Sequence, residues 1–227
     1  MSANGTPLTR AGRIVGVLVY PETEVADFCA PFEVFATTRL DEEMRRETES
    51  PIQQLIVAES IEPVRLNGGM RILPNVDFDT CPKLDMLLVP GGQGVRALLH
   101  NSEYIDWLKK MAPQVNRLAS VGNGSLLLAQ AELLVGKTAT THFQWVDFFR
   151  ERFPRTSLLP ELEMVVDGNI TTAASIRAGV DMALYVVAQT YGEEIARNAA
   201  RQMEYPYPDE RRLRNPYEQR PSSRNPR

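Results

Sequence analysis

The chain has 227 residues and a formal net charge of −4 at neutral pH. Its hydrophobic content of 43% and charged content of 24% are those of an ordinary globular domain with a substantial core. The negative net charge argues against a nucleic-acid-binding domain, and no apolar run reaches the length of a membrane span.

Cysteine and histidine are both scarce. Cys29 and Cys81 are too few for a disulfide framework, and the polar N-terminus lacks the apolar segment of a signal peptide. His100 and His142 belong to no cluster with metal-ligand spacing, so we expect no metal site. These features predict a cytoplasmic protein without a metal or other cofactor.

Strand-like and helix-like patterns alternate along most of the chain. Apolar runs predict strands at 14–20, 53–58, 85–90, 118–121 and 138–140, a hairpin at 63–74 and a strand pair within 163–172. Helical spacing predicts a helix from Pro31, a helix capped by Ser102, and helices at 125–134, 143–153, 176–187 and 192–203. The alternation predicts a flavodoxin-like three-layer α/β sandwich with a mostly parallel sheet.

Composition divides the chain into one domain and two ends. Residues 1–13 are polar and are expected to form a flexible lead, whereas residues 14–204 carry the strand and helix patterns. Residues 205–227 are rich in proline and arginine and nearly free of aliphatic side chains. We expect this tail to be flexible. The alternative is an arm that wraps a partner subunit or binds an anion.

Three segments are expected to meet at the carboxyl ends of the strands, where open α/β sheets form their sites. They are the loop around Asp27, the pair Gly91 and Gly92, and the turn of Gly122 and Asn123. The last turn joins a buried strand to a helix, which is the arrangement of a nucleophile elbow. Its apex is a glycine, so the scaffold for covalent catalysis is predicted without a nucleophile.

Each candidate residue has a second interpretation. Asn123 and the glycine after it could form a hairpin turn, although the leucine-rich segment that follows lacks strand alternation. Asp27 could cap the following helix, and the Gly-Gly pair could be ordinary turn residues. Cys29, near a helix N-terminus, could be a displaced nucleophile or a small buried filler. His142 could approach the site or make a structural hydrogen bond to backbone.

Five motifs occur in order at characteristic spacing. They are Asp-Phe-Cys-Ala-Pro-Phe-Glu-Val-Phe, Leu-Leu-Val-Pro-Gly-Gly, Ser-Val-Gly-Asn-Gly-Ser-Leu-Leu-Leu-Ala, Ala-Thr-Thr-His-Phe and Val-Asp-Gly-Asn-Ile-Thr-Thr-Ala. Together they resemble the ThiJ/PfpI family of the class I glutamine amidotransferase-like superfamily. The resemblance covers about residues 14–204 and is strongest to isonitrile hydratase and the sensor domains of AraC-type regulators. It implies the flavodoxin-like fold and a homodimer.

The resemblance also implies roles for individual residues. The family's Ser-Val-Cys-Thr-Gly pattern places its nucleophilic cysteine on Gly122 and the threonine of the hydratase branch on Asn123. Its acidic partner falls on Asp27, and the backbone amides for a developing oxyanion fall around Gly92 and Asn123. The Cys-His pair of the protease-like branches is missing, so we set peptidase and glyoxalase functions aside.

We therefore predict a homodimer that binds a small molecule in the elbow pocket without covalent catalysis. The pocket is expected to be bounded by Asp27, Gly91, Gly92, Gly122 and Asn123. One alternative is an isonitrile-hydratase-like lyase, which forms an N-substituted formamide, with a replaced or displaced nucleophile. Another is the sensor domain of a transcription regulator. No membrane or direct nucleic-acid contact is expected.

Overall fold

A seven-stranded sheet forms the centre of the computed structural model, which describes residues 12–208. The strand order is β10-β11-β7-β6-β1-β2-β5. All neighbours pair in parallel except β10 and β11, which form the predicted antiparallel pair. The strands are β1 (Arg13–Leu18), β2 (Ile52–Ala58), β5 (Val76–Asp77), β6 (Met86–Val89), β7 (Arg117–Val121), β10 (Met164–Asp167) and β11 (Ile170–Ala173).

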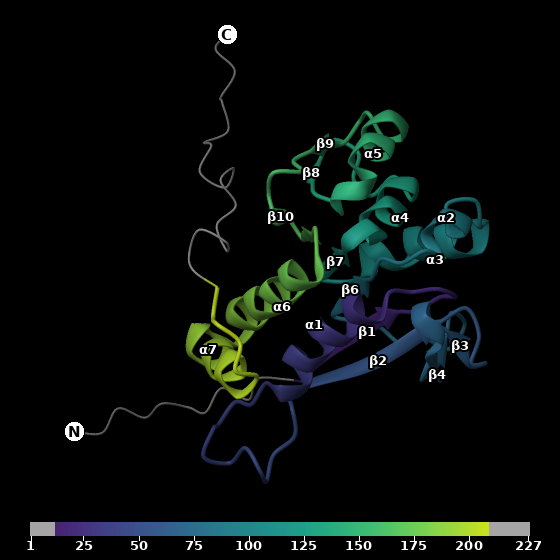
Figure 1. Cartoon of the computed structure of the whole chain (residues 1–227). Helices are drawn as coiled ribbons and strands as arrows, with labels where there is room; N and C mark the ends of the chain where they lie inside the picture. Colours follow the sequence, from purple (N-terminus) through teal and green to yellow (C-terminus); the bar gives the residue numbers. More distant parts are fainter. Residues whose placement is uncertain (1–11, 209–227) are drawn as a thin grey trace.

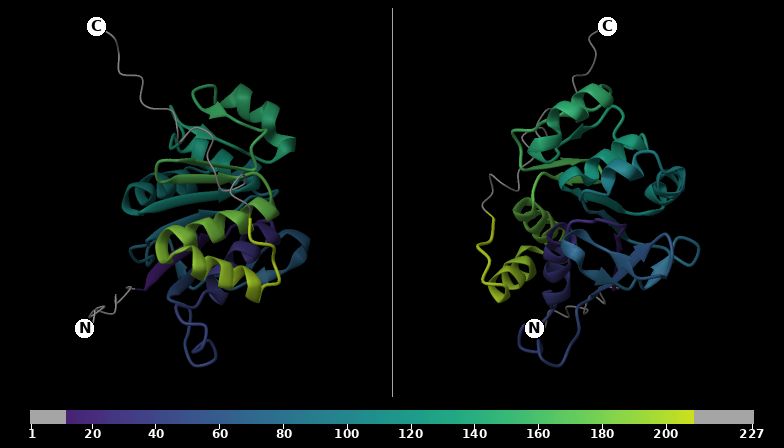
Figure 2. Two further views of the ribbon diagram at one scale, coloured as in Figure 1. Left: turned by 90° about the vertical axis from the view of Figure 1, so that its left-hand side faces the viewer. Right: turned by 45° about the vertical axis from the view of Figure 1, so that its right-hand side comes forward.

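Helices cover both faces of this sheet (Figures 1 and 2). On one side are α1 (Val25–Thr37) and α6 (Ile176–Tyr191), with α7 (Glu193–Gln202) packed against them. On the other side are α2 (Val95–Leu98), α3 (Ser102–Met111), α4 (Ser125–Gln130) and α5 (Val146–Arg152). The predicted fold class, a flavodoxin-like α/β sandwich with a mostly parallel sheet, is confirmed.

Short elements connect the main layers. The predicted hairpin consists of β3 (Val64–Arg65) and β4 (Arg71–Ile72), joined by the 3₁₀ turn η1 (Asn67–Gly69). A second small sheet pairs β8 (Thr138–Ala139) with β9 (Ser157–Leu158). The other 3₁₀ turns are η2 (Ala112–Gln114), η3 (Gly122–Gly124) and η4 (Phe143–Trp145).

The apolar runs of the strands supply two cores, one on each face of the sheet. In β7, Leu118 packs in the core beneath α3 and α4, whereas Ala119 and Val121 pack in the core beneath α1 and α6. Successive side chains of a strand point to opposite faces, so a strand between two helical layers buries both rows of its side chains. This burial explains why the sequence shows continuous apolar runs.

Helix α1 begins six residues earlier than predicted, at Val25, and Pro31 lies inside it. Proline has no N–H to donate to the carbonyl four residues back, which is that of Asp27, and it normally ends a helix. Here Phe28, Pro31 and Phe35 are all buried. Packing of this face therefore outweighs the local preference on which the prediction relied.

Two other helix ends also differ from the prediction. The cap of α3 is Asn101 and not Ser102, because the Asn101 side chain accepts a hydrogen bond from the N–H of Glu103 over 2.9 Å. Helix α4 ends at Gln130 and not at Leu134.

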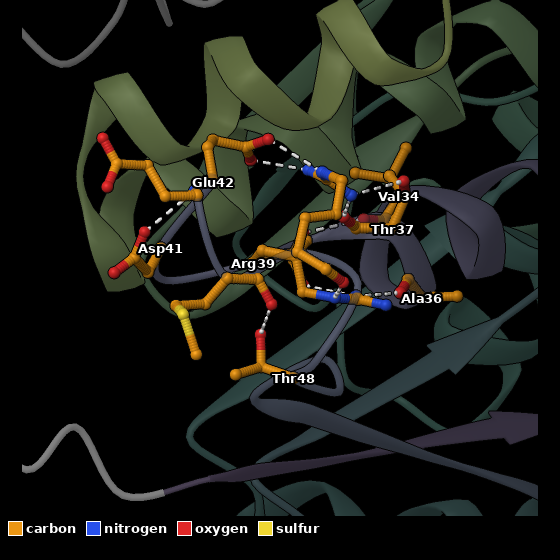
Figure 3. A network of polar contacts seen from close by, with 11 residues as sticks. Val34, Ala36, Thr37, Arg39, Asp41, Glu42 and Thr48 are labelled. Carbon is orange, nitrogen blue, oxygen red and sulfur yellow. Dashed lines mark hydrogen bonds and ion pairs between the residues drawn. The ribbon is translucent and has the colours of Figure 1, made fainter.

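Charged side chains of the loop after α1 bind the end of that helix (Figure 3). Arg45 donates to the carbonyl of Thr37 over 2.7 Å and pairs with Glu42. Arg39 donates to the carbonyl of Ala36 over 2.8 Å and to that of Thr38 over 2.9 Å. The last carbonyls of a helix have no donor within the helix, and the side chains of these two arginines supply the missing donors.

The predicted lead and tail fall mostly outside the described residues, which exclude 1–11 and 209–227. The first described residues of the predicted tail pack on the domain. The Tyr205 hydroxyl donates to Asp181 over 2.7 Å, and the guanidinium of Arg197 lies 4.4 Å from the centre of the Tyr207 ring. Among the described helices, none has both the length and the apolar character needed to span a membrane.

Candidate functional site

The three segments expected to converge do so at the carboxyl edge of the sheet. The N–H of Glu24, just before α1, donates to the carbonyl of Gly91 over 2.9 Å. Thr23 and Gly92 form a single antiparallel bridge. The turn after β7 closes the group, because both Gly91 and Gly122 approach the carboxyl group of Asp27.

Gly122 directly follows β7 as the first residue of η3, and its φ of +58° lies in the left-handed region that suits glycine. A Cβ at this position would lie only 2.7 Å from Oδ2 of Asp27. The carbonyl of Gly122 accepts hydrogen bonds from the hydroxyls of Ser125, over 3.3 Å, and Thr141, over 3.4 Å. The backbone and its neighbours thus leave no room for a side chain unless Asp27 moves.

Asp27 is the third residue of α1 and is only 6% exposed. Its Oδ2 accepts a hydrogen bond from the N–H of Gly91 over 3.1 Å. Burial raises the pKa of Asp27 to about 6; the Gly91 hydrogen bond lowers it, and the nearby charge of Glu24 raises it. The capping interpretation fails, because the N-cap of α1 is Glu24 and the Asp27 carboxyl reaches across to another loop.

The side chain of Asn123 makes two hydrogen bonds to one residue. Its Oδ1 accepts from the N–H of Gly92 over 2.8 Å, and its Nδ2 donates to the Gly92 carbonyl over 3.0 Å. Gly92 has a φ of +143°, and a Cβ there would lie 2.3 Å from the carbonyl oxygen of Glu22. A Cβ at Gly91 would lie 2.3 Å from Oδ1 of Asn123. Both glycines are therefore required by close packing at this edge.

These residues border an open cavity of about 390 Å³, a volume in the range of small-molecule sites. The predicted residues Asp27, Gly92, Gly122 and Asn123 line it. Gly91 is not among the lining residues, and it acts instead through its contacts with Asp27 and Asn123. The hairpin interpretation of Asn123 is wrong, because η3 leads directly into α4.

Other walls of the cavity come from segments that the sequence did not single out. Trp145 belongs to η4, and Ser175, Ile176 and Arg177 form the start of α6 after β11. The loop position of Ser175 after a buried strand is the signal that could have placed it at this edge. No comparable signal marks Trp145, because its place depends on how the segment after β8 folds back.

His142 lines the cavity and also makes a local structural contact. Its Nδ1 accepts a hydrogen bond from the N–H of Gln144 over 3.4 Å, and its ring centre lies 4.5 Å from that of Phe143. Partial burial lowers the pKa of His142. Both interpretations left open for this residue therefore hold.

Cys29 does not have the environment of a reactive thiol. It is exposed on α1, it is not among the cavity-lining residues, and partial desolvation raises the pKa of its thiol. The interpretation of Cys29 as a small buried filler is wrong, because its side chain is exposed, and helix α1 begins earlier than predicted, so Cys29 is its fifth residue. Within residues 12–208, no group of three or more His, Cys, Asp or Glu side chains could hold a metal ion.

Known proteins are similar to this chain over most of its length. The profile of the DJ-1/PfpI family matches residues 13–189. Isonitrile hydratase of Pseudomonas putida is 33% identical over 192 residues, which are 84% of this chain and 78% of that enzyme. The HTH-type transcriptional regulator CdhR of Pseudomonas aeruginosa is 33% identical over 135 residues, 59% of this chain. The chain spans only 39% of that regulator's length.

A solved structure agrees with these matches. The crystal structure of a ThiJ/PfpI family protein from Pseudomonas syringae superposes with a TM-score of 0.75 at 30% identity. The superposition covers 92% of this chain and 83% of that protein. The resemblance inferred from the five motifs is confirmed. Both the profile and the superposition show that this chain belongs to the DJ-1/PfpI family.

Proposed function

We propose that this protein binds a small molecule non-covalently in the cavity beside Gly122, and that Gly122 occupies the family's nucleophile position. The observation that carries the proposal is the contact between Gly122 and Asp27. The backbone turn and its acidic neighbour are present, but a side chain would overlap the carboxyl group. A covalent mechanism needs a nucleophile within reach of the bound substrate, and Gly122 provides none.

Three hydroxyl groups beside the turn or in the cavity wall are already engaged, those of Ser125, Thr141 and Ser175. Ser125 and Thr141 both donate to the carbonyl of Gly122. Ser175 lines the cavity, but its hydroxyl oxygen accepts a hydrogen bond from the N–H of Ala178 as the cap of α6. None of the three contacts a general base that would activate it as a nucleophile.

The backbone also argues against an oxyanion site at Gly92. An oxyanion hole works through N–H groups that are free to meet the developing charge. The N–H of Gly92 already donates to Oδ1 of Asn123, which occupies the position that a substrate oxygen would need. A substrate could use this donor only after the Asn123 side chain had moved away.

Two relatives define the alternative functions. Similarity to isonitrile hydratase supports a lyase that converts an isonitrile to an N-substituted formamide. That reaction would need a displaced nucleophile, and the position of Cys29 outside the cavity disfavours it. Similarity to CdhR supports a ligand sensor of a transcription regulator, which is a form of non-covalent binding and agrees with the main proposal.

The direct test is incubation of the full chain with a simple alkyl isonitrile, with formamide measured by NMR and protein mass by intact mass spectrometry. We expect no product above the buffer rate and no adduct. Product at an enzyme-like rate would overturn the proposal. A Cys29→Ser variant would then show whether Cys29 is the nucleophile.

A further inference from the structure

The cavity contains two carboxylates with no ion-pair partner among the described residues, Asp27 and Glu24. Asp27 is 6% exposed, and within residues 12–208 only the N–H of Gly91 donates to it, at Oδ2. Glu24 accepts a hydrogen bond from Nδ2 of Asn67 over 2.6 Å. A buried carboxylate without a counter-charge is costly, so this pair favours a cationic ligand.

The other charged or titratable groups of the cavity do not neutralise these carboxylates. Arg177 is already paired with Glu163. His142 has a lowered pKa because of desolvation, so it is neutral at pH 7. Gln93 and Gln144, which also line the cavity, carry no charge. The described walls therefore have a surplus of negative charge at neutral pH.

Helix N-termini attract anions, and α1 and α6 both begin at this cavity. The start of α1 is already faced by Glu24 and Asp27. The start of α6 is capped by Ser175, and its arginine is paired. The start of α1 thus carries the protein's own carboxylates, and neither helix start is a free anion site.

The rest of the cavity offers apolar and aromatic surface. Trp145 lines it, and the guanidinium of Arg96 lies 4.8 Å from the centre of the indole ring. Ile176 lines it too, and its side chain is 44% exposed. Asp27 lines the same cavity. An apolar ligand body could therefore contact Trp145 and Ile176 while a polar end reaches Asp27.

We propose that the ligand is a small organic ammonium ion with at least one N–H, held by Asp27 and Glu24 with its apolar body against Trp145 and Ile176. This inference rests on the proposed non-covalent function. An N–H is required because Oδ1 of Asp27 receives no hydrogen bond from any described residue, whereas a fully substituted ammonium could not donate one. A charged pair of this kind makes the stronger class of hydrogen bond.

The proposal has a consequence for pH. The titratable or charged groups that face Asp27 or share its cavity are Tyr20, Glu24, His142 and Arg177. Asp27 has a pKa of about 6, so it is mostly ionised above pH 7 and mostly protonated at pH 5. An ammonium ligand should therefore bind more weakly as the pH falls from 7.5 to 5, because protonation removes its counter-charge.

The test uses the full chain and three probes of one shape: 2-phenylethylamine, 2-phenylethanol and trimethyl(2-phenylethyl)ammonium. Binding is measured by calorimetry and by NMR shifts of the Trp145 indole, with buried Trp107 as the reference signal. At pH 7.5 we expect the amine to bind at least tenfold more tightly than the other two, with this advantage lost at pH 5.

Variants assign the effect to the carboxylates. Asp27→Asn should abolish the amine's advantage. If this variant does not fold, Glu24→Gln serves as the second test and should reduce the advantage. Asp85→Asn is the matched control, because Asp85 pairs with Arg13 near the start of β1 and does not line this cavity. The control should leave the preference unchanged.

Other outcomes separate this inference from the proposed function. Equal binding of the amine and the alcohol at Trp145 would overturn the ammonium class and leave non-covalent binding intact. Equal binding of the trimethylated probe would overturn the N–H requirement, and failure of all three probes to bind would overturn the whole inference. Formamide production from an isonitrile would instead overturn the proposed function.

Discussion

Asn123 and Gly92 are joined by a reciprocal pair of hydrogen bonds, of 2.8 Å from the Gly92 N–H to Oδ1 and 3.0 Å from Nδ2 to the Gly92 carbonyl. The pair ties the turn after β7 to the turn after β6. Asn123 is 6% exposed, so water cannot readily replace these bonds. The same side chain thereby stabilises the edge of the sheet and occupies the N–H of Gly92.

We expect Asn123→Ala to lower the free energy of unfolding by about 1–3 kcal/mol, because it leaves both polar groups of the Gly92 backbone without their partner. Urea denaturation measures this loss. Asn116→Ala is the control, since Asn116 makes an exposed bond of 3.2 Å to Asp85 and should cost less. Equal losses of unfolding free energy in the two variants would show that the two hydrogen bonds of Asn123 stabilise the fold no more than an exposed one does.

Gly122→Ala should destabilise the protein more than Gly136→Ala. Both glycines have positive φ values, +58° and +72°, so both variants suffer backbone strain of about 1–3 kcal/mol. Only Gly122 has a close neighbour, because a Cβ there meets Asp27, whereas nothing lies within 4 Å of one at Gly136. Denaturation of the two variants side by side isolates the contact. A smaller cost at Gly122 would contradict the geometry described for this turn.

Gly122→Cys should create a thiol with a pKa below the free value of about 8.5, because the turn leads into the N-terminus of α4. The rate of alkylation against pH measures it in a Cys29→Ser, Cys81→Ser background. Ionised Asp27 opposes the thiolate, so adding Asp27→Asn should lower the thiol pKa further. A thiol that titrates like free cysteine, or does not react at all, would contradict the elbow assignment.

Stability should fall as the pH rises from about 4 to about 6. Burial raises the pKa of Asp27 from its ordinary value of 3.8 to about 6, so in this interval the folded protein binds more protons than the unfolded chain. The change corresponds to about 3 kcal/mol, and this stabilisation is complete below pH 4 and absent well above pH 6. Denaturation of the Asp27→Asn variant from pH 4 to pH 8 should show a gain at high pH and little change at pH 4.

Asp167→Asn provides a control of opposite sign. Burial opposes ionisation of Asp167, but hydrogen bonds from Thr138 and the charge of Lys137 leave its pKa lowered. Its contribution is therefore present above about pH 4 and is lost as the pH falls. The variant should lose stability mainly at high pH, and a gain there would contradict the assignment.

Chains that end at Pro208 and at Glu204 should differ in stability. The longer one keeps the bond from Tyr205 to Asp181 and the contact of Tyr207 with Arg197, whereas the shorter one loses both. We expect the longer chain to melt like the full protein and the shorter one to melt several degrees lower, because about 1 kcal/mol shifts the melting temperature of a domain this size by about 2–4 °C. Sedimentation of both beside the full chain tests the predicted homodimer. A dimer of the full chain with a monomer at 1–208 would show that dimerisation needs residues 209–227, and a monomer of the full chain would contradict the prediction.

Part of the site could be predicted because it follows directly from chain order. The loop after β1, Gly91-Gly92 after β6 and Gly122 after β7 all come at the carboxyl ends of parallel strands, and such ends meet at one edge. The start of α1 could not be predicted in the same way. Pro31 predicts a helix start by its local chemistry, but burial against the helical layer keeps it inside the helix.

The sequence by itself determined the layered fold and the glycine at the turn after β7. Runs of apolar residues and their alternation with helical patterns are local properties, and a missing side chain needs no structure to be seen. Only the tertiary structure decided that Asn123 closes on Gly92, that Asp27 meets Gly91 and Gly122, and that Trp145 and Arg177 complete the walls. Those contacts join residues far apart in the chain, so their distances, burial and pKa values exist only once the strands and helices have packed.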